Sequence, residues 1–242
     1  MNKMNPISAI KDGWMCAKKH FIVSLGLLLA YLVVSSLTSL LPAGISTLLS
    51  FFVTLVWSLG IVRISIDVVD GDEPRFGAFR EVMPLLVHYL FMVVIMSVLV
   101  LVPMFLIMIV AAIACSVSFS TLMAGDLSAL SAVSLWIFVS AIPAIYVSIR
   151  FFFAPYLMVD RNVSPIEALK MSWKASYPVQ FKLLLFFVLA MVVMMLGFIC
   201  FIVGVLVSMI VLFYAQAALY RQAFPAGLQD PLLVEEKELV VE

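Results

Sequence analysis

Six long apolar stretches run through this chain, and its positively charged residues fall in the segments that would share one side of a membrane. Each stretch is near or above the roughly 20 residues that a helix needs to cross the hydrocarbon core of a bilayer. The stretches lie at about 21–41, 45–69, 85–118, 130–159, 181–200 and 202–220. The pattern predicts an all-α, polytopic membrane protein with six transmembrane helices.

The composition agrees with lipid as the main solvent. Of the 242 residues, 65% are hydrophobic and 12% are charged, and the mean hydropathy is +1.23. A soluble globular domain carries about 25% charged residues, because it must cover its surface with polar groups. The chain therefore has too little polar surface to form a soluble globule.

The distribution of Lys and Arg fixes the predicted orientation. All fourteen lie before the first stretch or near the connections that follow the second, fourth and sixth. They are Lys3, Lys11, Lys18, Lys19, Arg63, Arg75, Arg80, Arg150, Arg161, Lys170, Lys174, Lys182, Arg221 and Lys237. The opposite connections, at 41–44, 116–131 and 197–204, contain neither residue type, and Asp126 is their only charge. Because positively charged loops stay on the cytoplasmic side, we expect both termini to be cytoplasmic, in the inner membrane of a bacterium.

Two alternatives bear on this topology. A secretory signal peptide competes for the first stretch, but its apolar region would be about 7–15 residues long, shorter than the stretch found here. The last two stretches compete with one long helix broken between Gly197 and Gly204. A single helix of about 40 residues would be about 60 Å long, twice the hydrocarbon thickness, so a hairpin fits better.

A nine-residue motif occurs twice. Residues 6–14 (PISAIKDGW) and 165–173 (PIEALKMSW) share five identities in nine positions without a gap. Residues 74–80 form a degenerate third copy. Each copy directly precedes an apolar hairpin, which predicts three parallel pseudo-repeats within one transmembrane domain, 1–224. The pseudo-repeats lie at about 5–70, 73–160 and 164–224.

The motif has the features of a short amphipathic helix. Ser164 is a good N-cap, and Glu167 three residues later completes a capping box. Ile166, Leu169 and Trp173 have the i, i+3, i+7 spacing of one helix face, with lysines beside it. Such a helix would lie in the cytoplasmic interface, with its tryptophan at headgroup depth and its lysines toward anionic phosphates.

The three predicted interfacial helices supply the candidate binding residues. The side chains expected to contact lipid or a partner are Lys11, Trp14, Arg75, Lys170, Trp173 and Lys174. The functional interpretation is recognition of anionic lipid headgroups or of a partner protein. The alternative is that these helices only seat each hairpin and enforce the topology.

Charged residues also lie near the ends of two predicted crossings. Arg63 is followed by Asp67 and Asp70, and Arg150 is followed by Asp160. Arg63 and Asp67 are i, i+4 neighbours that can pair on a helix, which lowers the cost of placing an arginine inside the boundary. We interpret both sets as a structural bracket that ties a crossing to the interfacial helix after it, with a substrate site as the alternative.

Two adjoining segments resemble a known family. Residues 150–160 (RFFFAPYLMVD) and 164–173 (SPIEALKMSW) are similar to the pattern of bacterial YciC-like membrane proteins and of the membrane domain attached to some glycerophosphodiester phosphodiesterases. The resemblance implies a multi-pass inner-membrane protein. That family has no established chemistry, so the resemblance implies no catalytic residues.

The sequence lacks the usual signatures of catalysis and metal binding. It contains two histidines, His20 and His88, and no GxSxG, HExxH, phosphate-loop or dinucleotide motif. Its three cysteines, Cys16, Cys115 and Cys200, have no CxxC or Cys/His spacing. We expect no enzyme activity, no cofactor, no metal site and no nucleic-acid partner.

These observations favour a non-enzymatic membrane protein that binds or organises lipid, or that acts as a subunit or accessory of a larger membrane complex. Self-association is a further option, because the bundle would keep apolar flanks. The alternative function is a small transporter or channel for an apolar or amphipathic solute. The acidic tail at 225–242 is expected to be disordered in the cytoplasm.

Overall fold

The structure, a computed structural model, describes residues 4–115 and 127–225, and these are helical with no strand. Six helices are long and apolar enough to cross a membrane. They lie within Phe21–Ser39, Ala43–Val69, Ala78–Ala111, Val139–Arg161, Pro165–Ile199 and Val203–Ala223, and the third, fourth and fifth of these ranges each join a long helix to a short one. The predicted all-α, multi-pass class is therefore confirmed. The acidic tail beyond Pro225 and the connection that contains Asp126 lie outside the described residues.

The described helices form three hairpins, each preceded by a short helix. In chain order they are α1 (Pro6–Lys19), α2 (Phe21–Ser39), α3 (Ala43–Val69), α4 (Ala78–Val82), η1 (Met83–Leu85), α5 (Leu86–Cys115), α7 (Leu127–Arg150), α8 (Ala154–Arg161), α9 (Pro165–Ser176), η2 (Tyr177–Val179), α10 (Gln180–Ile199) and α11 (Phe201–Ala223). The hairpins are α2–α3, α5–α7 and α10–α11, and α1, α4 and α9 precede them.

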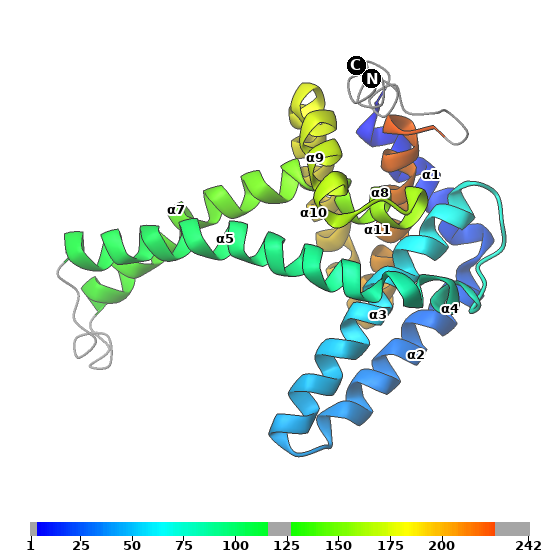
Figure 1. The fold of residues 1–242 in the computed structure, drawn as a ribbon, viewed down its shortest axis with the longest axis horizontal. Helices are drawn as coiled ribbons and strands as arrows, with labels where there is room; N and C mark the ends of the chain where they lie inside the picture. The colour runs from blue at the N-terminus through cyan, green and yellow to red at the C-terminus, as the bar shows by residue number, and fades with distance from the viewer. Residues whose placement is uncertain (1–3, 116–126, 226–242) are drawn as a thin grey trace, which may run out of the picture.

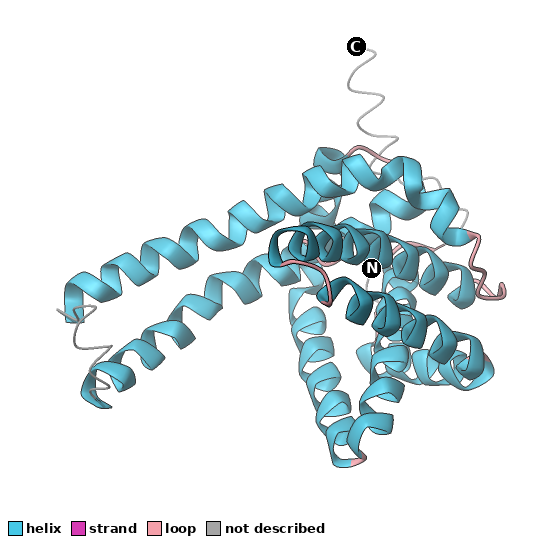
Figure 2. Ribbon diagram, turned by 90° about the horizontal axis from the view of Figure 1, so that it is seen from below, coloured by secondary structure: helices cyan, strands magenta, loops and turns pink. Residues whose placement is uncertain are grey.

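The three hairpins diverge from one region. In Figure 1, α2–α3 extends downward and α5–α7 extends to the left, while α1, α4, α8 and α9 lie where the hairpins meet. Figure 2, seen from below, shows α5–α7 again on the left and α10–α11 extending in a third direction. We call the meeting region the hub: it consists of α1, α4, α8, α9 and the hairpin ends that contact them.

The last two apolar stretches form two helices joined by a sharp turn at Cys200. Phe201 begins α11 with a positive φ of 60°, which reverses the chain direction. The two glycines beside the turn let the helices approach closely, because a Cβ atom at Gly204 would clash with the carbonyl oxygen of Gly197. Residues 181–220 are therefore a hairpin, as the length argument favoured.

The fourth apolar stretch differs from its prediction as one helix over 130–159. Helix α7 ends at Arg150, and α8 begins at Ala154 after a tight turn. Pro155 lies in the first turn of α8, where its missing N–H costs no helical hydrogen bond, so it favours the start of a new helix there. The carbonyl of Arg150 instead accepts hydrogen bonds from Ser172 Oγ at 2.9 Å and Ser176 Oγ at 3.0 Å. The break thus places α8 in the hub.

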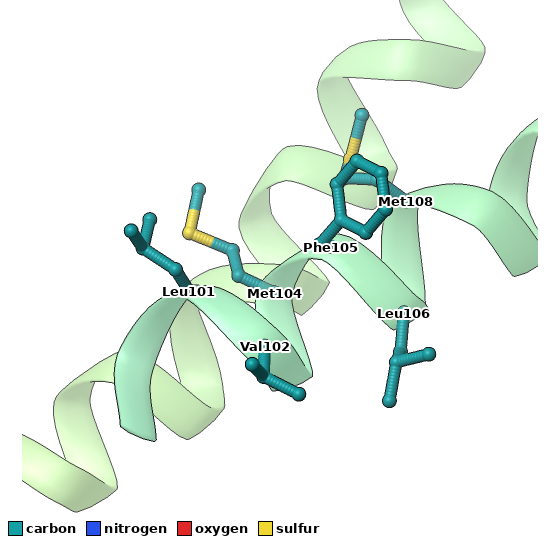
Figure 3. Close-up of a pocket in the computed structure, with 6 residues that line it drawn as sticks. All are labelled: Leu101, Val102, Met104, Phe105, Leu106 and Met108. Atoms are coloured by element: carbon teal, nitrogen blue, oxygen red, sulfur yellow. The ribbon is translucent and has the colours of Figure 1, made fainter. Parts of the chain in front are cut away.

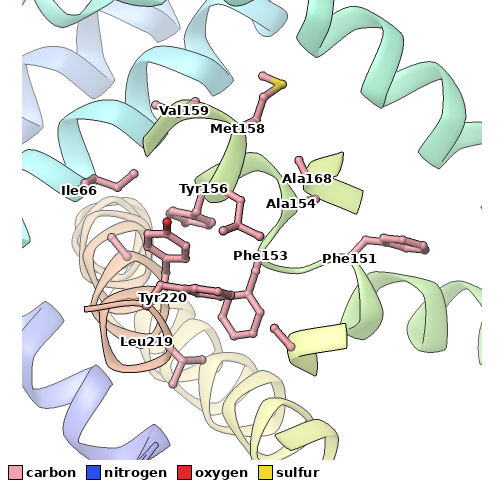
Figure 4. Close-up of a cluster of buried hydrophobic side chains, with 14 of the residues drawn as sticks. Ile66, Phe151, Phe153, Ala154, Tyr156, Met158, Val159, Ala168, Leu219 and Tyr220 are labelled. Carbon is pink, nitrogen blue, oxygen red and sulfur yellow. The ribbon is translucent and has the colours of Figure 1, made fainter. Parts of the chain in front are cut away.

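Aromatic side chains fill the centre of the hub (Figure 4). The ring of Tyr220 stacks on those of Tyr156 and Phe224, with ring centroids 5.4 Å and 5.3 Å apart. Phe153, from the turn before α8, is fully buried against the same group. The core that joins the three hairpins therefore lies in the hub.

Close backbone contact seats α1 on α11. A Cβ atom at Gly13 would lie 2.6 Å from the backbone nitrogen of Ala215 and 2.7 Å from the carbonyl oxygen of Val211. Helix α4 packs on α3 in similarly close contact, because a Cβ atom at Gly60 would clash with the ring of Phe79. Small residues therefore set how closely these short helices approach the hairpins.

The outer parts of the hairpins are much less packed. In the most apolar 18-residue segment of Val139–Arg161, half of the residues are buried. In the corresponding segment of Ala78–Ala111, none are buried. Along α5, an open and wholly apolar recess of about 490 Å³ is lined by Leu101, Met104, Phe105 and their neighbours (Figure 3). These side chains are left for lipid to cover.

Candidate functional site

Arg221, in the last turn of α11, joins the ends of the other two hairpin units. Its Nε and Nη2 atoms donate to the two carboxylate oxygens of Asp70 at 2.8 Å and 2.6 Å. Its Nη1 and Nη2 atoms donate to those of Asp160, both at 2.8 Å. The hydroxyl of Tyr220 also donates to Asp160, at 2.7 Å. Two bidentate contacts from one guanidinium hold α3, α8 and α11 together. We call Asp70, Asp160, Tyr220 and Arg221 the Arg221 cluster.

This cluster corrects the predicted bracket. The prediction grouped Asp160 with Arg150 and Asp70 with Arg63, but both aspartates bind Arg221. From the sequence, Arg221 is predicted only as a cytoplasmic cation. The missed signal is that an aspartate follows each of the second and fourth crossings and one arginine ends the last crossing. The contacts span 61 and 151 residues, so local spacing does not reveal them.

Arg63 has the local partner that its spacing suggests. Its Nε atom lies 3.3 Å from Asp67 Oδ1 and 3.6 Å from Glu81 Oε2. The second contact links α3 to α4. Since these side chains are about a quarter to two thirds exposed, water screens the pairs. Arg63 and Glu81 also line an open recess of about 290 Å³ together with Asn162 and their apolar neighbours.

Arg150 lies among aromatic rings. Its guanidinium carbon is 5.0 Å from the ring centroid of Tyr146, 4.7 Å from that of Trp173 and 4.8 Å from that of Tyr177. The Nε and Nη2 atoms donate to the Tyr146 hydroxyl at 3.0 Å and 2.9 Å. Only 4% of Arg150 is exposed, and its Nη1 atom is buried without a hydrogen-bond partner. We call these four residues the Arg150 site.

The two copies of the nine-residue motif form α1 and α9, and both begin with a side-chain cap. Asn5 Oδ1 accepts hydrogen bonds from the backbone nitrogens of Ile7 and Ser8 at 3.0 Å and 3.4 Å. Ser164 Oγ accepts one from the backbone nitrogen of Glu167 at 3.3 Å. A polar side chain therefore fixes where each helix starts.

The same positions are exposed on both helices. Ile7, Lys11 and Trp14 form one exposed face of α1, and Ile166, Lys170 and Trp173 form the equivalent face of α9. The two tryptophans are exposed to 45% and 41%. Lys174 is exposed beside Trp173, and Lys18 Nζ lies 5.0 Å above the ring of Trp14. We call these two surfaces the Ile-Lys-Trp faces.

The faces differ in detail from the predicted stripe. Leu169, which the i, i+3, i+7 pattern grouped with Ile166 and Trp173, is buried instead. The buried side of α9 consists mainly of small residues, Ala168, Ser172, Ala175 and Ser176. Small side chains allow this side of α9 to pack closely in the hub. In the degenerate third copy, Arg75 is exposed in the loop before α4.

Burial also affects the one cysteine that lies on a short hub helix. Cys16 on α1 is half-buried, and that burial raises the pKa of its thiol. The charge of Asp12 raises the pKa further, while Lys19 lowers it. Within residues 4–115 and 127–225, no three His, Cys, Asp or Glu side chains are grouped so that they could hold a metal ion.

Comparison with known proteins gives no relative: no family model, no curated protein and no solved structure matches this chain.

Proposed function

We propose that this protein is a non-enzymatic component of the bacterial inner membrane that binds lipids with anionic headgroups at its cytoplasmic face. The hub would lie at that face, with both termini inside the cell, and the three hairpins would cross the bilayer. The single observation that carries the proposal is the pair of matching Ile-Lys-Trp faces on α1 and α9.

Packing within the protein explains only part of this match. Five residues are identical between the two motif copies: Pro, Ile, Ala, Lys and Trp. The proline and alanine are buried on both helices, so contacts inside the hub account for them. The isoleucine, lysine and tryptophan are exposed on both helices. Identical exposed side chains favour a common partner outside the protein.

The chemistry of the two faces suits a lipid headgroup. Tryptophan favours the membrane interface because its ring is apolar and its N–H is polar. A lysine near an anionic surface contributes about 1 kcal/mol of attraction. Lys11 and Lys170 would therefore favour anionic over zwitterionic lipid, while Ile7, Ile166 and the tryptophans would anchor each helix at headgroup depth.

The hairpins support a role in organising lipid around the protein. Their outer side chains are apolar and exposed, as on α5 at Leu101 and Phe105. Acyl chains would cover these surfaces between the diverging hairpins. Another membrane subunit or a second copy of the chain would cover them equally well, as the accessory role requires. The resemblance to YciC-like proteins implies the same location and stays a prediction.

A transporter or channel for an apolar or amphipathic solute is the alternative. Such a protein needs a polar or water-filled cavity between its hairpins. Aromatic rings occupy the described meeting point of the hairpins (Figure 4), which favours the lipid-binding proposal.

The test is a lipid-preference measurement on the double variant Lys11→Gln, Lys170→Gln. The wild-type protein in nanodiscs that contain equal phosphatidylglycerol and phosphatidylcholine should retain phosphatidylglycerol preferentially when it is released for native mass spectrometry. The double variant should lose most of this preference, about fivefold for each lysine.

The matched control is Arg80→Gln, which removes an exposed cation of α4 outside the two faces. This variant should keep the wild-type preference. Equal retention of both lipids by the wild-type protein would contradict the proposal, as would an unchanged preference in the double variant.

A further inference from the structure

The Arg150 site contains a buried cation with no carboxylate partner among the described residues. Two other half-buried arginines near the hairpin ends have such partners. Arg63, whose Nε atom also lacks a hydrogen bond, lies within ion-pair distance of Asp67 and Glu81, and Arg221 binds Asp70 and Asp160. Arg150 has only ring faces and the Tyr146 hydroxyl. A charge taken out of water needs hydrogen bonds to all of its donors, and the Nη1 atom has none.

The site lies just below the surface of the protein. Arg150 itself is almost fully buried, but the rings that cover it, those of Tyr146, Trp173 and Tyr177, are exposed to 45%, 41% and 66%. Exposed side chains change rotamer within nanoseconds, so a ring can move aside without disturbing the hub. The unpartnered Nη1 atom is therefore one side chain away from the membrane interface.

Trp173 belongs both to this site and to the Ile-Lys-Trp face of α9. A headgroup held at that face would lie next to the ring that covers Arg150, with the exposed Lys170 and Lys174 on the same helix. The guanidinium group presents a planar fork of donors that matches the oxygen atoms of a phosphate. The aromatic rings around it would exclude water from the contact.

We infer that Arg150 binds the phosphate group of one anionic lipid, with Trp173 and Tyr177 opening and closing over it. This inference rests on the proposed function and adds a specific site to it. The α1 face lacks an equivalent: the cation over Trp14 is the exposed Lys18. The two faces should therefore differ, with the tighter lipid at α9.

The experiment compares Arg150→Gln with Arg80→Gln, which removes an exposed cation outside the two faces, in full-length protein in a neutral detergent. Thermal unfolding is followed while phosphatidylglycerol, phosphatidylcholine or inorganic phosphate is added. We expect phosphatidylglycerol to stabilise the wild-type protein most. The apparent affinity for it should fall about tenfold in Arg150→Gln, and by less than about twofold in Arg80→Gln, because charge-assisted hydrogen bonds to phosphate are lost only in the first variant.

The outcomes separate the inference from the proposed function. If the wild-type protein does not distinguish phosphatidylglycerol from phosphatidylcholine, the proposed function fails. If it does, and Arg150→Gln keeps the wild-type affinity, only the assignment of Arg150 fails. Equal stabilisation by inorganic phosphate at the same concentration would overturn the lipid as the source of the phosphate group.

A second measurement on the wild-type protein keeps the inference testable if Arg150→Gln does not fold. A phosphatidylglycerol analogue with a photoreactive group near its phosphate, in nanodiscs, should label the segments that contain Tyr146 and residues 173–177. Unlabelled phosphatidylglycerol should compete for this labelling. Labelling confined to other segments would overturn the inference.

Discussion

The hub and the outer hairpins use their polar side chains in different ways. On the hairpins, the hydrogen bonds of these side chains stay within one hairpin: Ser36, Thr47 and Ser97 each donate to the carbonyl four residues earlier in the same helix, at 2.8 Å. Thr38 with Ser50, and Ser208 with the carbonyl of Val193, join only the two helices of their own hairpin. In the hub, polar side chains bond between elements: Ser172 to the Arg150 carbonyl, Gln222 to Ser8, and Arg221 to two aspartates.

This difference follows from the solvent of each region. A helix in lipid must satisfy its polar groups internally, because no water is available there. Apolar side chains gain little by leaving lipid for protein, so the hairpins need not pack tightly against one another. In the proposed orientation the hub lies at the membrane surface, where water competes for polar groups and packed side chains are needed to hold elements together. The specific arrangement of the three hairpins is therefore encoded in the hub.

The largest contrast is expected for leucine truncation in the two regions. Leu157 in α8 is fully buried and Leu101 in α5 is 60% exposed. Leu157→Ala should lower the free energy of unfolding by about 3 kcal/mol, because it leaves a cavity in the hub. Leu101→Ala should change it by less than about 0.5 kcal/mol. Reversible unfolding in mixed micelles measures both, and equal losses would show that the hub is not the more packed region.

Removal of Arg221 should have the next largest effect on the free energy of unfolding. Arg221→Gln leaves Asp70 and Asp160 without their cation, and the Arg221 side chain is only 13% exposed. We expect a loss of about 2 kcal/mol, below the value for a fully buried pair because Asp70 is partly exposed. Arg221→Lys should recover part of the loss. An Arg221→Gln variant as stable as the wild-type protein in the same unfolding assay would show that the Arg221 cluster does not stabilise the fold.

Two glycine substitutions should change the free energy of unfolding in opposite directions. A Cβ atom at Gly13 in the hub meets the backbone of α11, whereas one at Gly26 in α2 meets nothing within 4 Å. Gly13→Ala should destabilise by about 1–3 kcal/mol through overpacking. Gly26→Ala should stabilise by about 0.5 kcal/mol, because alanine is the better helix former. Parallel melting curves of the two variants test this, and a stabilising Gly13→Ala would contradict the close packing of α1 on α11.

The native cysteines of the two regions should differ in their rates of reaction. Cys16 in the hub is half-buried with a raised thiol pKa, whereas Cys200 at the tip of α10–α11 is exposed. Because the thiolate is the reactive form, Cys16 should react with a maleimide at pH 7 about fivefold or more slowly than Cys200 in detergent. Raising the pH should speed the Cys16 reaction, since its thiol must lose a proton.

Single-cysteine variants separate the two rates. Unfolding in dodecyl sulfate provides the control, because it should make them similar. A Cys16 that reacts as fast as Cys200 in the folded protein would show that α1 is not packed on the hub.

The sequence predicts the features of this molecule that depend on local pattern. Apolar length predicts the six crossings, the N-cap Ser164 predicts the start of α9, and i, i+4 spacing places Arg63 beside Asp67. Each of these depends on residues within one helix. The orientation and the pseudo-repeats stay predictions from the same patterns.

The features that sequence reasoning missed depend on distant partners. The break after Arg150 is capped by Ser172 and Ser176, which lie on α9. Asp160 finds its cation 61 residues away, on α11. Leu169 is buried although it has the spacing of an exposed stripe, because the small residues beside it bring that side of α9 against the hub. Hydrophobic periodicity contains no information about which surface a helix will meet.

The most direct test of the account is the side of the membrane on which the hub lies. A variant with Cys16, Cys115 and Cys200 replaced by serine would receive one cysteine at a time, at Asp72 or Asn162 in exposed hub turns or back at Cys200. In intact cells, an impermeant maleimide should label the protein with Cys200 alone, and in inverted membrane vesicles it should label only Asp72→Cys and Asn162→Cys. Labelling of either hub variant from outside intact cells would contradict a cytoplasmic hub.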